Sequence, residues 1–286
     1  MARKGILIDI NRCTGCYNCF LACRDEHFGN DYLPFSAAQP LNGQFWMRIN
    51  EIERGKFPRP KVAYIPNPCM HCKAAPCIAA AKDEAVYKRP DGVVVIDPVK
   101  SKGQKEIVNA CPYRAIHWND EMQIPQKCTM CVHRLDEGER EPRCVESCPS
   151  GAMYFGDLDD PSSEIATVIK AASNAGNSSK VEAFHPEYGT DPSVLYIGIP
   201  KRFVAGEVVL SDNSGECAHS VKITLEGNGE KRVILSDSYG DFEFEGLEKN
   251  TDYKITVEKD GYATYKTQIF TKTDLNLGEV VLSSLK

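Results

Sequence analysis

The sequence lacks the features that mark several large classes of protein. No apolar run in its 286 residues is long enough to span a membrane as a helix. The formal net charge is −6, so there is no basic excess of the kind that indicates nucleic-acid binding. The N-terminal stretch MARKGILIDINRC has neither the apolar core of an export signal nor an Arg-Arg pair. We therefore expect a cytoplasmic protein, unless a partner carries it to another compartment.

Cysteine, in contrast, is abundant. The chain has 13 cysteines, and all except Cys217 fall between residues 13 and 148. An odd number, with several cysteines only three or four residues apart, argues against an extracellular disulfide framework. The length is sufficient for two domains, each with a core of its own. The clustering of the cysteines therefore indicates metal binding.

The cysteines form four groups whose spacing is typical of iron-sulfur ligands. The first group is a C-x2-C-x2-C-x3-C run, as in bacterial ferredoxins, and the third and fourth groups end in Cys-Pro. Structural zinc is the alternative, because paired C-x2-C motifs often hold it. Zinc does not explain the ferredoxin run or the two Cys-Pro endings, so we favour iron-sulfur clusters. The groups are Cys13, Cys16, Cys19 and Cys23; Cys69, Cys72 and Cys77; Cys111; and Cys128, Cys131, Cys144 and Cys148.

The third group, Cys111 alone, is the end of a ferredoxin run whose other ligands are missing. Counting back from Cys111 with the ferredoxin spacing gives three positions without cysteine, which are Ser101, Gln104 and Ile107. The register is supported because IDPVKSKG (96–103) aligns with IDINRCTG (8–15) at the first run. The second group lacks its fourth ligand in the same way, since the spacing predicts that ligand at Ala81.

These absences describe one missing cluster. In two-cluster ferredoxins the last cysteine of a run ligates the cluster of the other run. With that exchange, Ala81, Ser101, Gln104 and Ile107 form one site without ligands, which we call the lost site. The remaining cysteines fill three 4Fe-4S sites with none left over. Site A comprises Cys13, Cys16, Cys19 and Cys148; site B comprises Cys23, Cys128, Cys131 and Cys144; site C comprises Cys69, Cys72, Cys77 and Cys111.

The same exchange predicts an α+β fold. The first and fourth groups enclose the second and third, so residues 1–200 should form two nested bacterial-ferredoxin-like units. Residues 201–286 read as seven short strands with polar turns, typical of an antiparallel β-sandwich. This C-terminal domain resembles transthyretin-like or carboxypeptidase-regulatory-like modules. It has no visible catalytic constellation, and we interpret Cys217 and His219 as ordinary sandwich residues.

Residues 1 to about 200 resemble the iron-sulfur subunits of the dimethyl-sulfoxide-reductase family of molybdenum enzymes. The resemblance rests on CTGCYNCFLAC, PCMHCKAAPC, ACPYRAIHW, KCTMCVHRL and CVESCPSGAMYFGDLDDP. The usual family pattern has four clusters, and this sequence departs from it at the lost site. Three clusters and a C-terminal sandwich are most similar to the small subunits of transhydroxylases that act on phenols. Arg114 also departs, standing where the family commonly has glycine; it would either raise a cluster potential or form a surface ion pair.

The resemblance implies an electron-transfer subunit without its own substrate site, paired as a heterodimer with a large molybdopterin-containing catalytic subunit. That partner would act on phenols as a transhydroxylase, hydroxylase or dehydroxylase, and site A would lie nearest its molybdenum. The three clusters would serve either as a shortened relay or as an electron reservoir. Alternatives are a subunit of another anaerobic molybdenum reductase, a free-standing soluble polyferredoxin, and a scaffold whose clusters only stabilise the fold.

The connection between the first two cysteine groups, residues 24–68, is rich in aromatic side chains. Two interpretations of them remain open, which are packing over the clusters and a docking surface for a partner. The aromatic residues are Phe28, Tyr32, Phe35, Phe45, Trp46 and Phe57.

Overall fold

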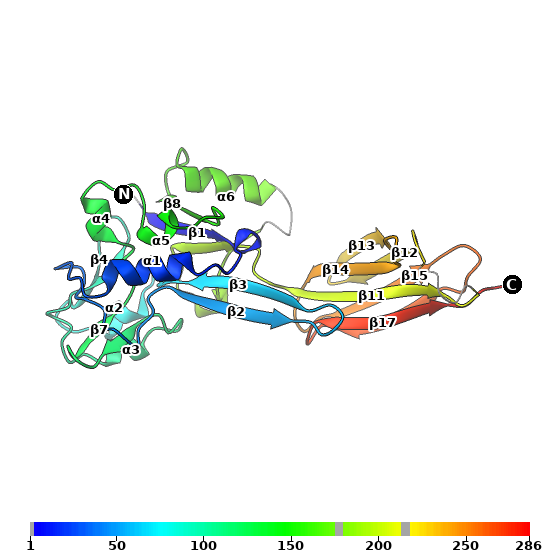
Figure 1. Cartoon of the computed structure of the whole chain (residues 1–286), viewed down its shortest axis with the longest axis horizontal. Helices are drawn as coiled ribbons and strands as arrows, with labels where there is room; N and C mark the ends of the chain where they lie inside the picture. Colours follow the sequence, from blue (N-terminus) through cyan, green and yellow to red (C-terminus); the bar gives the residue numbers. More distant parts are fainter. Residues whose placement is uncertain (1–2, 175–179, 213–217) are drawn as a thin grey trace. The chain divides into compact units, whose positions relative to one another are not determined.

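The computed structural model describes residues 3–174, 180–212 and 218–286 (Figure 1). The chain divides into two compact units, one made of Met1–Ile52 with Ala63–Ile199 and the other of Glu53–Val62 with Pro200–Lys286. Within the described ranges, no helix is both long and apolar enough to cross a membrane. Cys217 lies outside the described residues, so its interpretation as a sandwich residue stays a prediction.

The first unit is built on a four-stranded sheet in the order β8-β1-β10-β9. β1 runs antiparallel to β8 and parallel to β10. Alternate β1 side chains face opposite ways: Ile6 and Ile8 join the core that contains the cysteines, while Leu7 packs with Ile165 of α6. The elements are β1 (Lys4–Asp9), η1 (Ile10–Arg12), α1 (Asn18–His27), α4 (Val132–Asp136), α5 (Arg143–Glu146), β8 (Met153–Asp157), α6 (Glu164–Asn174), β9 (Val181–Ala183), η3 (Pro186–Tyr188) and β10 (Val194–Ile197).

A second set of elements lies inside the first in sequence. β4 pairs with β5, α2 packs against α3, and β6 pairs with β7. In the enclosing set β1 pairs with β8 and α1 packs against α5, an arrangement consistent with the nesting inferred from the cysteine exchange. The inner elements are α2 (Pro76–Ala80), β4 (Val86–Lys88), β5 (Val94–Ile96), α3 (Glu106–Asn109), β6 (His117–Asn119) and β7 (Ile124–Gln126).

The second unit contains two sheets around one apolar core. The sheet orders are β14-β11-β17 and β13-β12-β15-β16, and buried residues of both sheets belong to the same core cluster. The prediction of an antiparallel arrangement throughout is wrong, because β11 and β17 are parallel. Alternating apolar residues indicate a strand but do not specify its neighbour, and here the first and last strands of the unit pair. The strands are β11 (Arg202–Leu210), β12 (Lys222–Gly227), β13 (Glu230–Leu235), β14 (Asp241–Leu247), β15 (Asp252–Glu258), β16 (Tyr265–Phe270) and β17 (Leu275–Leu282).

A hairpin from the N-terminal half contributes its tip to the second unit. β2 (Arg48–Arg54) and β3 (Lys61–Asn67) form a two-stranded sheet, and residues 53–62 belong to the second unit. Lys61 forms ion pairs with Glu243 and Glu245 of β14. The sequence-based boundary at residue 201 does not include this segment. Contacts between residues so distant in sequence leave no local pattern from which they could be predicted.

Candidate iron-sulfur sites

The four cysteines of site A lie close to one another at the start of α1 and the end of α5. Burial, and next the charges of Cys13, Cys148 and Cys16, raise the pKa of the Cys19 thiol to about 12. The backbone N–H of Ala152 donates to Cys148 Sγ at 3.3 Å. Cys16 is exposed and Cys19 is buried, so site A reaches from the core to the surface.

Site B is the most deeply enclosed set, since all four of its cysteines are buried. Burial is the main cause that raises the pKa of Cys128 to about 11 and that of Cys131 to about 12. The pKa of Cys23 is raised well above its ordinary value, by burial first and then by the nearby charges of Cys128 and Cys131. Cys144 lies close enough to Cys131, Cys23 and Cys128 for their charges to raise its pKa as well. The Met130 N–H donates to Cys128 Sγ at 3.3 Å, and His27 Nε2 lies 3.8 Å from Cys131 Sγ.

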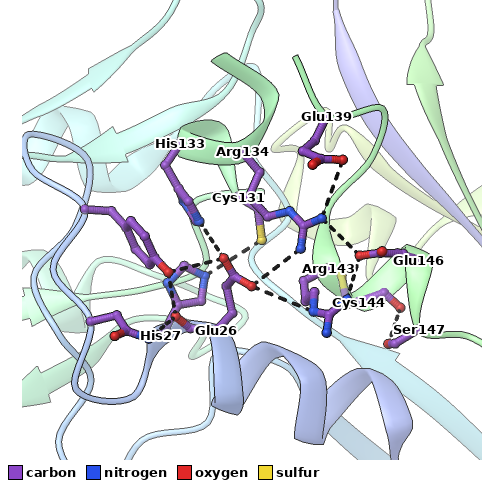
Figure 2. Close-up of polar contacts among 12 residues, drawn as sticks. Glu26, His27, Cys131, His133, Arg134, Glu139, Arg143, Cys144, Glu146 and Ser147 are labelled. Atoms are coloured by element: carbon purple, nitrogen blue, oxygen red, sulfur yellow. Dashed lines mark hydrogen bonds and ion pairs between the residues drawn. The ribbon is translucent and has the colours of Figure 1, made fainter. Parts of the chain in front are cut away.

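A network of charged side chains connects the segments that carry site B, as Figure 2 shows. The Glu26 carboxylate on α1 accepts a hydrogen bond from His133 Nε2 at 2.9 Å and lies 3.5 Å from Arg134 Nη1. Arg134 also pairs with Glu146 of α5 at 3.1 Å. Burial opposes the ionisation of Glu26, but the His133 hydrogen bond and the Arg134 charge lower its pKa below the ordinary value. The network therefore ties α1, α4 and α5 together around the buried cysteines.

Site C borders a cavity. The four cysteines of the site line it together with side chains that are mostly apolar, among them Met70, Val94 and Ile116. Burial is the main cause that raises the pKa of Cys72 to about 12 and that of Cys77 to about 11. The Ala115 N–H lies 3.4 Å from Cys111 Sγ.

The lost site is also brought together, and protein atoms fill it. Ile107 is fully buried in one apolar cluster with Val86 and Ile96, and Ala81 packs against that cluster. The Gln104 amide accepts from the Lys82 N–H at 2.8 Å and donates to the Lys100 carbonyl at 2.8 Å. Ser101 is fully buried, and its hydroxyl has no hydrogen-bond partner among the described residues.

The donor sets fit iron-sulfur clusters. Each set consists only of thiols, and sulfur donors suit iron and zinc, whereas calcium and magnesium require oxygen. Each set also has at least one backbone N–H close to a sulfur, the kind of hydrogen bond that stabilises a cluster thiolate. Burial raises the pKa of Cys19, Cys77, Cys128 and Cys131, so a bound cation favours ionisation of these thiols.

The aromatic segment between the first two cysteine groups divides into two kinds of residue. Trp46 is buried in the cysteine-containing core, and Phe35 packs against it, so packing near the cysteines is confirmed for these two. Phe28 and Phe45 are 44% and 43% exposed, and Phe57 is 92% exposed. Docking of a partner stays a prediction for these three.

Sequence reasoning overlooked the polar residues beside the cysteines, chiefly Glu26, His27, His133 and Lys127. Their positions in the sequence could have indicated them, because each lies within about one helical turn of a cysteine along the chain. Arg114, by contrast, is exposed, and its φ of 53° explains why glycine suits this position. Among the residues with described side chains, no ion pair to Arg114 is found.

Comparison with known proteins identifies several relatives. Residues 60–158 match a family model described as a 4Fe-4S dicluster domain. The chain is 35% identical over 290 residues to the pyrogallol hydroxytransferase small subunit of Pelobacter acidigallici, covering 99% of this chain and 100% of that one. It is 37% identical to a subunit of tetrathionate reductase from Salmonella typhimurium, over 71% of this chain and 75% of that one. It is 34% identical to a subunit of sulfite dehydrogenase from Allochromatium vinosum, over 71% and 85%.

Proposed function

Because this chain belongs to the iron-sulfur subunits of the dimethyl-sulfoxide-reductase family of molybdenum enzymes, we propose that it carries three 4Fe-4S clusters for a large molybdopterin-containing subunit. The observation that supports the proposal is that Cys19, Cys144 and Cys72 each lie close enough to the other three cysteines of their proposed set to affect their ionisation. Each proposed set also has a backbone N–H directed at one sulfur. The thiols of sites A, B and C would hold the iron. Each cluster, when bound, would pass one electron at a time, while burial and nearby donors set its potential.

The neighbour relations support a linear order of the sites. Cys19 of site A is an electrostatic neighbour of Cys23 and Cys144 of site B. Cys128 of site B is in turn a neighbour of Cys69 of site C. Site B is then the buried middle step, and the exposed Cys16 makes site A the natural point of contact with the molybdenum partner. A Cys16→Ser variant tests this order, since unchanged electron flow to the partner would contradict it.

We further propose that the partner acts on phenols. The support is the relative whose similarity covers both units, because that protein is named a pyrogallol hydroxytransferase subunit. The two sheets around one core support assignment of the second unit to the transthyretin-like or carboxypeptidase-regulatory-like sandwiches. In a transhydroxylase the clusters would act as a reservoir, whereas in a reductase they would act as a through relay. Turnover of phenols without an external electron carrier favours the reservoir, and strict dependence on a carrier excludes it.

Elemental analysis of the native complex tests the main proposal. The complex is purified without oxygen through a tag on this chain. We expect a large co-purifying subunit, molybdenum or tungsten, and at least about twelve iron and twelve sulfide per copy of this chain. Iron without either heavy metal would indicate a free carrier instead, and stoichiometric zinc without iron would remove the electron-transfer function altogether. The cytoplasmic location stays a prediction.

A further inference from the structure

Lys127 is a buried positive charge between sites B and C. Its side chain is 3% exposed. The ammonium donates to the carbonyl oxygen of Val94, which lines the site C cavity, and to that of Cys128, a site B residue, at 3.0 Å. No carboxylate forms an ion pair with it in the part of the chain that the structure describes. The charge therefore has carbonyl dipoles around it but no anionic side chain.

A buried ammonium without a counter-charge is costly, since the free energy of removing a charge from water is large unless an anion compensates it. The anions within reach are thiolates. Burial raises the pKa of Cys77, Cys111 and Cys128, and the charge of Lys127 acts against that rise in all three. Two of these cysteines belong to site C and one to site B, and the Val94 carbonyl that Lys127 contacts lines the site C cavity.

We propose that Lys127 is the internal counter-charge of the site C cluster and that it raises the reduction potential there. The inference rests on the proposed function, which puts a cluster at site C. A reduced cluster carries one more negative charge than an oxidised one, so a nearby buried cation favours the reduced form. Electrons in the complex would then collect at site C, the end of the order A, B, C that is farthest from the exposed Cys16. In this role Lys127 changes the potential of the cluster through its charge and does not bind iron, which only the cysteines do.

Lys88 provides a matched comparison. Its ammonium donates to the carbonyl oxygen of Cys72, another site C residue, at 2.8 Å. Unlike Lys127, Lys88 is only half-buried, so solvent screens its charge. Lys88→Met should therefore change the site C potential in the same direction as loss of the Lys127 charge, and by less.

The test is a redox titration of the purified complex followed by electron paramagnetic resonance, with the site C signal identified through its loss in Cys77→Ala. Lys127→Gln keeps hydrogen-bond donors near the two carbonyls and removes the charge. We expect the ratio of reduced to oxidised site C at a fixed potential to fall about tenfold, equivalent to about 59 mV for a one-electron couple. Lys127→Arg should keep the parent value, and the site A potential should stay unchanged in every variant.

Unchanged site C potentials in Lys127→Gln, with all clusters present, would overturn the proposal. If Lys127→Gln loses the site C cluster, the Lys127→Arg variant distinguishes charge from packing. A site C cluster retained in Lys127→Arg would show that the positive charge is needed and would support the proposal. Loss of the cluster in Lys127→Arg as well would show that packing is needed and would overturn the proposal. Failure of the proposed function looks different, because the parent complex would then contain no signal that Cys77→Ala removes.

Discussion

Site C and the lost site match the same ferredoxin spacing in the sequence and differ in the residues at the ligand positions. Cys77 of site C and Ile107 of the lost site belong to one buried cluster. At site C four thiols and mostly apolar side chains line a cavity. At the lost site Ile107 packs into the core and the Gln104 amide bonds to the backbone of Lys82 and Lys100. The comparison teaches that apolar packing and backbone hydrogen bonds can occupy ligand positions that at site C carry thiols suited to a metal cluster.

The largest effect should come from removing a site C ligand. Cys77→Ala leaves the cluster with three thiolates, so we expect the loss of about four iron per chain and a lower free energy of unfolding of the first unit. Iron analysis and thermal unfolding of the purified complex measure both. Cys217→Ala, the same substitution at the cysteine assigned to no site, is the control and should leave the iron content unchanged. Full iron in Cys77→Ala would contradict the site C assignment.

The mirror experiment at the lost site is Ile107→Ala. Because Ile107 is fully buried in an apolar cluster, truncation should cost about 2–5 kcal/mol of unfolding free energy. The iron content should not change, in contrast to Cys77→Ala. Val108→Ala, at a half-buried neighbour, should cost less. Loss of iron in Ile107→Ala, with the fold retained, would mean that the two sites are not held independently.

Ser101 sharpens the comparison further. Its buried hydroxyl has no hydrogen-bond partner in the described part of the chain, so Ser101→Ala should be neutral or stabilise the first unit by about 1 kcal/mol. Ser236 is the matched control in the second unit, since its buried hydroxyl accepts from the Val221 N–H and donates to the Ala218 carbonyl. Ser236→Ala should destabilise by about 1–3 kcal/mol. Thermal unfolding of both variants measures the contrast, and a destabilised Ser101→Ala would reveal a partner for that hydroxyl.

Some of this arrangement could be predicted from the sequence. Cysteine spacing is readable because the ligands of a ferredoxin run lie three or four residues apart, as at Cys13, Cys16 and Cys19. The apolar runs GILIDI (5–10) and GVVVID (92–97) predict short buried strands, and β1 and β5 lie there. The partition of the cysteines into ligand sets stays a prediction that iron analysis of the variants decides.

Other features could not be predicted. The parallel pairing of β11 with β17 joins residues such as Val208 and Val280, and the hairpin tip joins Lys61 to β14. Pairings between such distant residues depend on the completed fold and leave no periodicity in the sequence. The burial of Lys127 is of the same kind, since lysine is ordinarily exposed and only the packing around sites B and C shows otherwise.

The smallest expected effect is that of removing a surface ion pair, and it tests how much surface charge stabilises the inner elements compared with packing. Arg89, which follows β4, forms two hydrogen bonds to Asp136 of α4, at 2.9 and 2.7 Å. The hydrogen bond from Arg89 holds the pKa of Asp136 below its ordinary value. A carboxyl with a lowered pKa binds its proton less readily in the folded state, so it stabilises the fold above the ordinary carboxyl pKa of about 4 and this contribution is lost as the pH falls.

Asp136→Asn should therefore cost less than about 1 kcal/mol at pH 7, because the carboxylate is 43% exposed and solvent screens the pair. The difference from the parent should shrink as the pH is lowered below about 4 and as salt is added. Unfolding of parent and variant across this pH range measures it. If Asp136→Asn lowered the unfolding free energy at pH 7 as much as Ile107→Ala does, the ion pair would stabilise the inner elements as much as apolar packing does. The comparison of site C with the lost site would then have to count surface charge as a third source of stability.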